Sequence, residues 1–153
     1  MKRMMMKRMM MMAMMAGLFC LAATAHAAAA TSAMAAKRVS VTGEIVDTWC
    51  YVTEIMYALG TAHHQCAVWC AAGGIPVSIL GDDGKVYVVL KLEDDGTNVA
   101  NPAILKIQTH RVTVNGDLFE RDGVKYLFVT QVADDKGVVN LTHAENGIQP
   151  FGE

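Results

Sequence analysis

The sequence predicts a mainly β fold, in which five short strands form a small domain that carries one helical insert. Three observations lead to this prediction. After residue 37, most of the chain alternates apolar and polar residues in short runs, which is the period of a half-buried strand. Turns that contain glycine separate these runs. One stretch, residues 50–72, breaks the alternation and holds three cysteines and two histidines.

The first strand is predicted at residues 38–47, where Gly43 marks a bulge or a close approach of two backbones. The insert follows it. Its residues 66–72 are rich in alanine and lack Gly and Pro, which predicts two turns of helix that end at Gly73-Gly74. The segment between, residues 53–59, predicts a further helical turn or a loop.

Four more strands are predicted at residues 76–80, 85–92, 111–119 and 124–132. The dipeptides Asp83-Gly84 and Asp122-Gly123 supply the positive-φ positions of tight turns. Asn101-Pro102 predicts the start of a short helix over residues 101–107, with Asn101 as its N-cap. The tail predicts one more short strand, at Val138 to Leu141.

A short helix between the third and fourth of five strands is the order of an OB-fold, a partly open Greek-key barrel. Gly43 in the first strand and Gly116 in the fourth suit the sharp bends that barrel closure requires. The alternative is another small β-sandwich or barrel. The predicted OB-like domain covers residues 38–153, after an alanine-rich disordered leader at 28–37.

Residues 1–27 predict a secretory signal peptide. A basic start with Lys2, Arg3, Lys7 and Arg8 precedes an apolar run, and the run ends at Ala25-His26-Ala27, an A-x-A cleavage signal. We therefore expect a periplasmic or secreted protein that is cleaved near Ala27. The apolar run is too short for a stable membrane span, and no second apolar run is long enough to cross a membrane, so no membrane insertion is expected after cleavage.

Cleavage would change the charge of the chain and remove most of its methionines. It takes away four of the 13 Lys and Arg residues and none of the 15 Asp and Glu residues, so the net charge moves from −2 to −6. An acidic mature chain disfavours nucleic acid and anionic membranes as partners. Only Met34 and Met56 of the 12 methionines would remain, which argues against a methionine-rich copper site.

The insert predicts a metal site. Cys66 and Cys70 are four residues apart, so on a helix they share one face with Cβ atoms about 5–6 Å apart. Disulfides prefer a mean Cβ separation of about 3.8 Å, so the gap suits two thiolates on one metal better. His63 joins this face if the helix extends back to it, with His64 as the alternative, and Cys50 can supply a fourth ligand. Three thiolates and one imidazole suit Zn²⁺, and thiolates also suit Cu(I).

Other interpretations of the same cysteines stay open. Three exported cysteines cannot all pair within one chain. Cys50 could form a disulfide with Cys66 or Cys70 and leave one inert thiol, or two of the three could work as an exchanging thiol–disulfide pair. Trp49 and Trp69, each next to a cysteine, are expected to pack in the core.

The insert and its flanks resemble a set of small secreted bacterial proteins. The resemblance is carried by Gly43 to Asp47, Cys50-Tyr51, His64 to Ala67, Cys70 and Gly74 to Val77, and it covers about half of the mature chain. In that set a histidine stands three residues before the middle cysteine and OB-like strands follow. Here His63 holds that spacing and His64 does not, so the resemblance favours His63 as the ligand. It implies a shared Cys-His unit and no particular activity.

The function predicted from these residues is an exported metal-binding protein that holds Zn or Cu through Cys50, His63, Cys66 and Cys70. Its role would be structural, metal delivery or electron transfer, with another exported redox or metal protein as partner. The alternatives are a thiol–disulfide redox protein and a disulfide-stapled OB-like binding module without metal. The sequence contains no phosphate loop, dinucleotide fingerprint or Gly-x-Ser-x-Gly motif, so an enzyme is the least supported class.

Overall fold

The computed structural model describes residues 36–55, 58–93 and 101–141, and five strands in these ranges close into a barrel. The strands are β1 (Lys37–Asp47), β2 (Val77–Gly81), β3 (Val86–Leu92), β4 (Arg111–Arg121) and β5 (Val124–Asp135). They pair in the order β1-β2-β3-β5-β4, and β4 pairs back with β1. Only the β3–β5 pair is parallel among these strands. The fold is therefore the OB-like barrel that the sequence predicts, and the strand bounds agree within three residues.

The barrel interior is filled by the apolar residues of the alternating strand pattern. Along β4, buried side chains alternate with partly exposed ones from Val112 to Leu118, as the sequence alternation requires. The innermost side chains of the whole barrel are at most 1 % exposed: Ile45, Ile79, Val112, Val114, Leu127 and Val129. Each such side chain contributes about 1.5–3 kcal/mol by leaving water.

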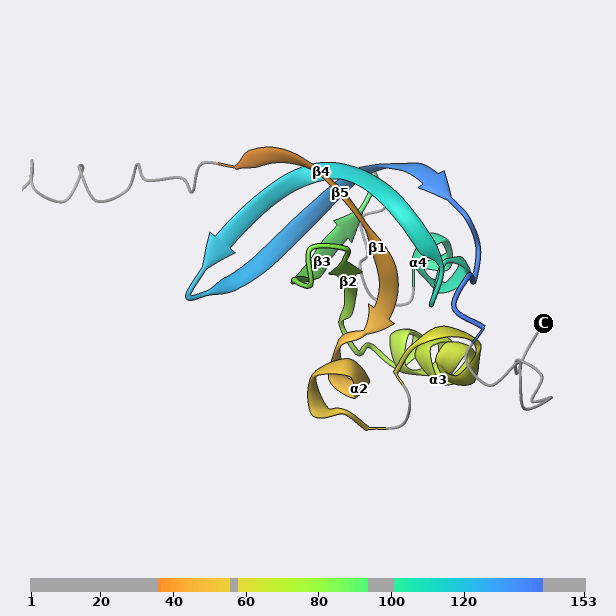
Figure 1. Cartoon of the computed structure of the whole chain (residues 1–153). Helices are drawn as coiled ribbons and strands as arrows, with labels where there is room; N and C mark the ends of the chain where they lie inside the picture. Colours follow the sequence, from red (N-terminus) through yellow and green to blue (C-terminus); the bar gives the residue numbers. More distant parts are fainter. Residues whose placement is uncertain (1–35, 56–57, 94–100, 142–153) are drawn as a thin grey trace, which may run out of the picture. The chain divides into compact units, whose positions relative to one another are not determined.

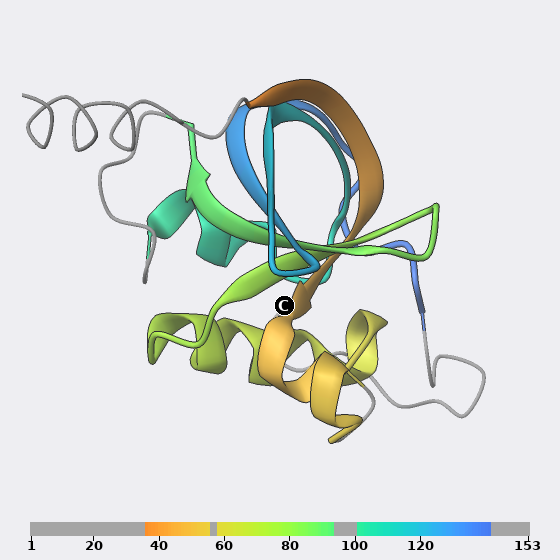
Figure 2. The same ribbon diagram turned by 90° about the vertical axis from the view of Figure 1, so that its left-hand side faces the viewer.

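Three helices accompany the barrel: α2 (Thr48–Thr53), α3 (Gly60–Ala72) and α4 (Pro102–Lys106). Helices α2 and α3 lie together beneath one end of the barrel in both ribbon views (Figures 1 and 2). Helix α4 begins as predicted, because the Asn101 side chain accepts a hydrogen bond from Ala103 N at 2.6 Å and Pro102 occupies its first turn.

Two glycines allow neighbouring strands to approach closely. A Cβ atom at Gly43 would collide with the backbone oxygen of Leu80, and one at Gly116 would lie 2.5 Å from the backbone oxygen of Phe128. Both positions were expected to be bends or close backbone contacts, and both are close contacts between paired strands. Any side chain at either position would force β1 away from β2, or β4 away from β5.

Two predicted elements differ from the structure. Helix α3 starts at Gly60, six residues before the predicted start. Residues 138–141 form no strand; instead the Asn140 carbonyl accepts a hydrogen bond from Thr61 N at 3.0 Å at the start of α3. The five-stranded closure already pairs both edges of each strand, so no edge is left for a sixth strand.

The predicted signal peptide at 1–27 lies outside the described residues, as do nearly all of the predicted leader and the tail from residue 142. In the described ranges, no helix is long and apolar enough to span a bilayer.

Candidate metal centre

The first ligand candidate, Cys50, lies on α2 and is held there by the residue that starts the helix. Asp47 is the N-cap of α2, and its Oδ1 accepts a hydrogen bond from Cys50 N at 2.9 Å. A second contact, 2.7 Å between the hydroxyl oxygens of Thr48 and Ser78, links the start of α2 to β2. Cys50 is consequently fixed to the end of the barrel and is only 2 % exposed.

Cys66 and Cys70 lie one turn apart on α3 and are partly exposed. Their Sγ atoms are 3.9 Å apart. Two thiolates bound to one tetrahedral Zn²⁺, with Zn–S distances of about 2.3 Å, would have sulfurs about 3.8 Å apart. The helical spacing of four residues therefore places this pair at the separation that a shared metal ion requires.

All three sulfurs converge on one point. The Sγ atoms of Cys50, Cys66 and Cys70 lie within 4.8 Å of one another, although Cys50 is 16 residues before Cys66. No disulfide joins these three cysteines, which are the described ones, and the Sγ atoms of Cys66 and Cys70 are well beyond the S–S bond length of about 2.05 Å. The structure thus gives a three-cysteine cluster near metal-binding geometry and offers no support for the predicted disulfide staple.

The two adjacent histidines point to different places. A ring nitrogen of His63 lies within 4.8 Å of the Cys50 sulfur, and the His63 side chain is fully buried. The Nδ1 atom of His64 instead donates to Gln108 O at 3.0 Å and lies 2.9 Å from Thr109 Oγ1. Its ring stacks on His110 with ring centroids 6.4 Å apart. The structure therefore brings His63 near Cys50 and not into the group of three sulfurs, and it holds His64 against the turn between α4 and β4.

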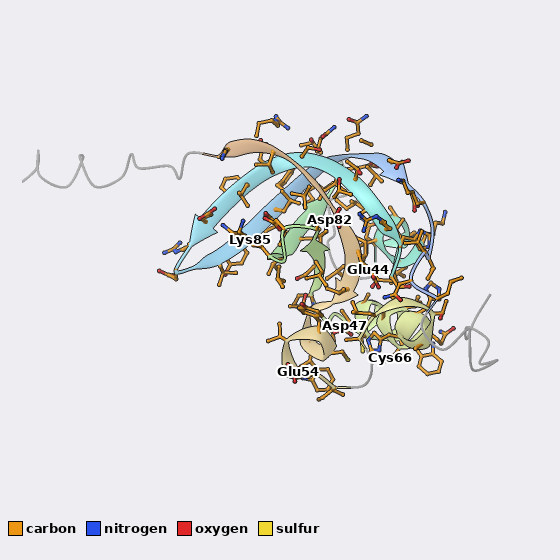
Figure 3. All side chains as sticks on the ribbon, in the orientation of Figure 1. Glu44, Asp47, Glu54, Cys66, Asp82 and Lys85 are labelled. Carbon is orange, nitrogen blue, oxygen red and sulfur yellow. The ribbon has the colours of Figure 1, made fainter. Side chains whose placement is uncertain are left out.

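Asp47 joins this site, although the sequence analysis gives it only the end of the first strand and a place in the resemblance, with no ligand or positioning role. A carboxylate oxygen of Asp47, a His63 nitrogen and the Cys50 sulfur form a second group within 4.8 Å, so Cys50 belongs to both groups. Figure 3 shows Asp47 at the junction of β1 and α2, and Cys66 on α3 beneath the same end of the barrel. The signal in the sequence was its position three residues before Cys50, which is the spacing of an N-cap.

Several polar atoms of this second group have no hydrogen-bond partner among the described residues. They are Asp47 Oδ2 and both ring nitrogens of His63. Asp47 is 1 % exposed, and it pairs with no lysine or arginine in the described ranges. An uncompensated buried carboxylate costs several kcal/mol, and buried polar atoms are normally satisfied. A bound cation would compensate the charge of Asp47 and would give the unpaired polar atoms a partner.

The surroundings favour the protonated form of two of the thiols. Burial, and then the charge of Asp47, raise the pKa of Cys50 from 9.0 to about 11. Burial and the Asp47 carboxylate also raise the pKa of Cys70. Burial lowers the pKa of His63, so its imidazole is neutral at pH 7 and able to act as a ligand. A cation would reverse the effect on the thiols, because a coordinated thiol loses its proton.

Helix α3 is fixed to the barrel at its start. Gly60 N donates to Glu44 Oε1 at 2.7 Å, and Glu44 Oε2 accepts from Asn140 Nδ2 at 3.4 Å. Helix α3 also packs against α4 and β1, with Ala67 and Ala71 buried. These contacts set the position of the residues that follow in the helix, including His63 and the two cysteines.

The expectation that the tryptophans pack in the core is wrong. Trp49 is 51 % exposed and Trp69 is 70 % exposed. Each lies beside a cysteine whose side chain turns toward the cluster, and adjacent residues of a helix point in different directions. Trp49 and Trp69 therefore lie on the outer side of α2 and α3.

The described cavity lies elsewhere, beside α4. It has a volume of about 690 Å³ and is lined in part by Lys106, His110 and Asp135. His110 Nδ1 donates to Asp135 Oδ1 there at 2.9 Å. The predicted ligands do not line this cavity, so the chemistry that the cysteines indicate belongs to the helical end of the barrel.

Comparison with known proteins found no match to a protein-family model, to a curated protein or to a solved structure. The resemblance to small secreted bacterial proteins therefore stays a prediction from the sequence.

Proposed function

We propose that this chain is an exported metal-binding protein that holds a thiolate-preferring ion, Zn²⁺ or Cu(I), through Cys50, Cys66 and Cys70. The observation that carries the proposal is the convergence of the three sulfurs within 4.8 Å of one another. Cys50 comes from α2, which directly follows β1, and Cys66 and Cys70 come from α3. Thiolates are the ligands that select Zn²⁺ and Cu(I) over harder ions.

The buried groups around the sulfurs support a cation at this point. Asp47 Oδ2 and the His63 nitrogens have no other partner in the described ranges, and they surround Cys50. A metal ion would compensate the carboxylate and accept an imidazole nitrogen. The pKa values of Cys50 and Cys70 are raised. Nucleophilic thiols have lowered pKa values, so these two cysteines do not have the environment of a reactive thiol.

Partial exposure of Cys66 and Cys70 favours a role in which the ion can be exchanged. Cys66 and Cys70 are partly exposed while Cys50 is buried, so a partner protein would reach the ion from the α3 side of the cluster. The proposed role is accordingly uptake or delivery of the ion, with another exported metal or redox protein as partner.

A second candidate function is thiol–disulfide exchange by Cys66 and Cys70. Their partial exposure and the 3.9 Å separation of their sulfurs favour it. The pair would reduce a disulfide of the partner to two thiols, giving up two electrons and two protons and closing an S–S bond of about 2.05 Å. The two sulfurs would have to approach each other along one helix face for this.

The two functions are separated by anaerobic metal titration of the full chain in which Cys20, the cysteine of the predicted signal peptide, is replaced by serine. Co²⁺ serves as a coloured substitute for Zn²⁺, and Cu(I) is titrated in parallel. We expect one ion per chain, with the thiolate-to-Co²⁺ absorption lost in Cys66→Ser. Val68→Ser, which places the same side chain between the two cysteines, is the matched control and should retain it.

A folded chain that takes up neither ion would contradict the metal proposal. If the same chain then consumed glutathione disulfide and formed a Cys66–Cys70 bond, detected by mass spectrometry, thiol–disulfide exchange would replace it as the function.

A further inference from the structure

Asp47 and His63 form a buried acid–imidazole pair beside the cysteine cluster. Each side chain is at most 1 % exposed. The pair lies within 4.8 Å, together with the Cys50 sulfur, and Asp47 Oδ2 and both ring nitrogens of His63 lack a hydrogen-bond partner among the described residues. Buried polar atoms normally have a partner, so two neighbouring buried side chains whose polar atoms lack one indicate a ligand.

The two ring nitrogens of His63 can serve two different purposes. A metal-bound histidine almost always donates its other ring N–H to a carboxylate or a carbonyl group. The Asp47 carboxylate is the acidic group that lies closest to His63 in this site, and its Oδ1 is already fixed by the Cys50 amide. Its Oδ2 is the oxygen that remains to accept a proton from the imidazole.

We propose that Asp47 is a positioning residue that holds His63 as the fourth ligand of the metal, and that the pair makes the site prefer Zn²⁺ over Cu(I). This inference rests on the proposed metal-binding function and names the ion. Zn²⁺ in protein sites is almost always four-coordinate and accepts mixed sulfur and nitrogen ligands. Cu(I) is softer and is satisfied by the three thiolates alone.

The negative charge of Asp47 also favours Zn²⁺ over Cu(I). The carboxylate of Asp47 lies next to the site with no lysine or arginine paired to it in the described ranges. Its attraction for a doubly charged ion is twice that for a singly charged ion at the same distance. Removing the charge should therefore reduce Zn²⁺ affinity more than Cu(I) affinity.

The variant Asp47→Asn removes the charge and the proton acceptor at Oδ2 while keeping the helix cap, because asparagine caps helices about as well as aspartate. Competition titrations with the full chain measure its Zn²⁺ and Cu(I) affinities. We expect Zn²⁺ binding to weaken about 10–100-fold, which is the usual cost of losing such a partner, and Cu(I) binding to weaken by a clearly smaller factor, because Cu(I) loses only the weaker attraction of the charge. His64→Gln is the matched control and should alter neither affinity.

A double-mutant cycle tests whether Asp47 acts through His63. In a His63→Gln background, Asp47→Asn should lower Zn²⁺ affinity by a smaller factor than in the wild-type chain, since the group that it positions has been removed and only the loss of charge remains. Nitrogen-15 NMR of the imidazole supplies an independent signal: zinc should bind one ring nitrogen of His63 in the wild-type chain while the other keeps its proton.

The inference is overturned if the wild-type chain binds Zn²⁺ and Asp47→Asn either leaves its affinity unchanged or weakens both ions equally. It is also overturned if the effects of Asp47→Asn and His63→Gln add. Should Asp47→Asn fail to fold, Asp47→Ser keeps a capping oxygen, and His63→Gln alone must still lower the ratio of Zn²⁺ to Cu(I) affinity. A wild-type chain that binds neither ion would instead remove the proposed function.

Discussion

His63 and His64 are neighbours on α3, yet their surroundings are opposite. His64 hydrogen-bonds to Gln108 O through Nδ1 and stacks on His110, so its ring is satisfied by the barrel. His63 is fully buried and finds no hydrogen-bond partner for either ring nitrogen among the described residues. His64 is thus held by the fold through its Nδ1, whereas both ring nitrogens of His63 lack a partner in the described ranges, and for this reason we propose His63 as the ligand.

The same contrast separates the two ends of α3. At its start, Gly60 N meets a carboxylate oxygen of Glu44, and Thr61 N meets the carbonyl of Asn140. In its middle and last turns, Cys66 and Cys70 lie near Cys50, and the three sulfurs are within 4.8 Å of one another. The start of α3 is therefore held by hydrogen bonds to the rest of the fold, whereas its later turns carry the cysteine cluster that we propose as the metal site.

The largest expected effect on this contrast comes from zinc. At a free Zn²⁺ concentration of 100 times the dissociation constant, the free energy of unfolding of the wild-type chain should rise by about 2.7 kcal/mol. His64→Gln should keep this gain, and His63→Gln should lose much of it at the same zinc concentration because its affinity is lower. Urea unfolding with and without zinc measures the gain. Equal gains in both variants would show that the two histidines do not differ as described.

The sequence contained enough information to locate the cysteine cluster but not to complete the site. The spacing of Cys66 and Cys70 predicted one helix face, and the H-x-x-C spacing favoured His63 over His64. Asp47 was not recognised, because a residue that ends a strand and caps a helix looks the same whether or not its second oxygen faces a cluster. The role of that oxygen depends on His63, which lies on α3, and α3 begins 13 residues after Asp47.

The barrel was more predictable than the helices. Strand alternation and the turns with Asp-Gly fix the strands locally, and Gly43 and Gly116 fix where they approach each other. Helix α3 gave no apolar stripe, because it buries small and polar residues such as Thr61 and His63. Its start was therefore placed six residues too late, and the exposure of Trp69 on its outer face could not be foreseen.

A second prediction compares the histidines in the absence of metal. His64→Leu should lower the free energy of unfolding by about 1–2 kcal/mol, since it removes a hydrogen bond and a ring contact. His63→Leu should cause no loss or a small gain, because it replaces an unsatisfied buried ring with an apolar side chain of similar size. Urea unfolding in the presence of a chelator measures both. A larger loss for His63→Leu than for His64→Leu would mean that His63 already has a structural partner without metal.

The smallest expected effect is a pH dependence of the free energy of unfolding that arises from Glu44 at the start of α3. Burial raises the pKa of Glu44 above 4.5, although Gly60 N–H, Asn140 and Arg111 partly oppose this. A carboxyl whose pKa is raised on folding stabilises the fold below its unfolded pKa, and this contribution is lost as the pH rises through the folded pKa. Relative to Glu44→Gln, the wild-type chain should thus lose stability as the pH rises from the unfolded pKa of glutamate, about 4.3, through the higher pKa of folded Glu44.

Chelator-treated protein keeps the metal site out of this measurement, and Glu44→Gln retains an oxygen that can accept from Gly60 N. The useful quantity is the difference in unfolding free energy between the two chains at each pH, because the other carboxylates titrate equally in both. A difference that stays constant across this range would mean that Glu44 titrates alike in the folded and unfolded chains. The start of α3 would then be as open to water as the cysteine side of the helix, and the contrast between its two ends would have to be given up.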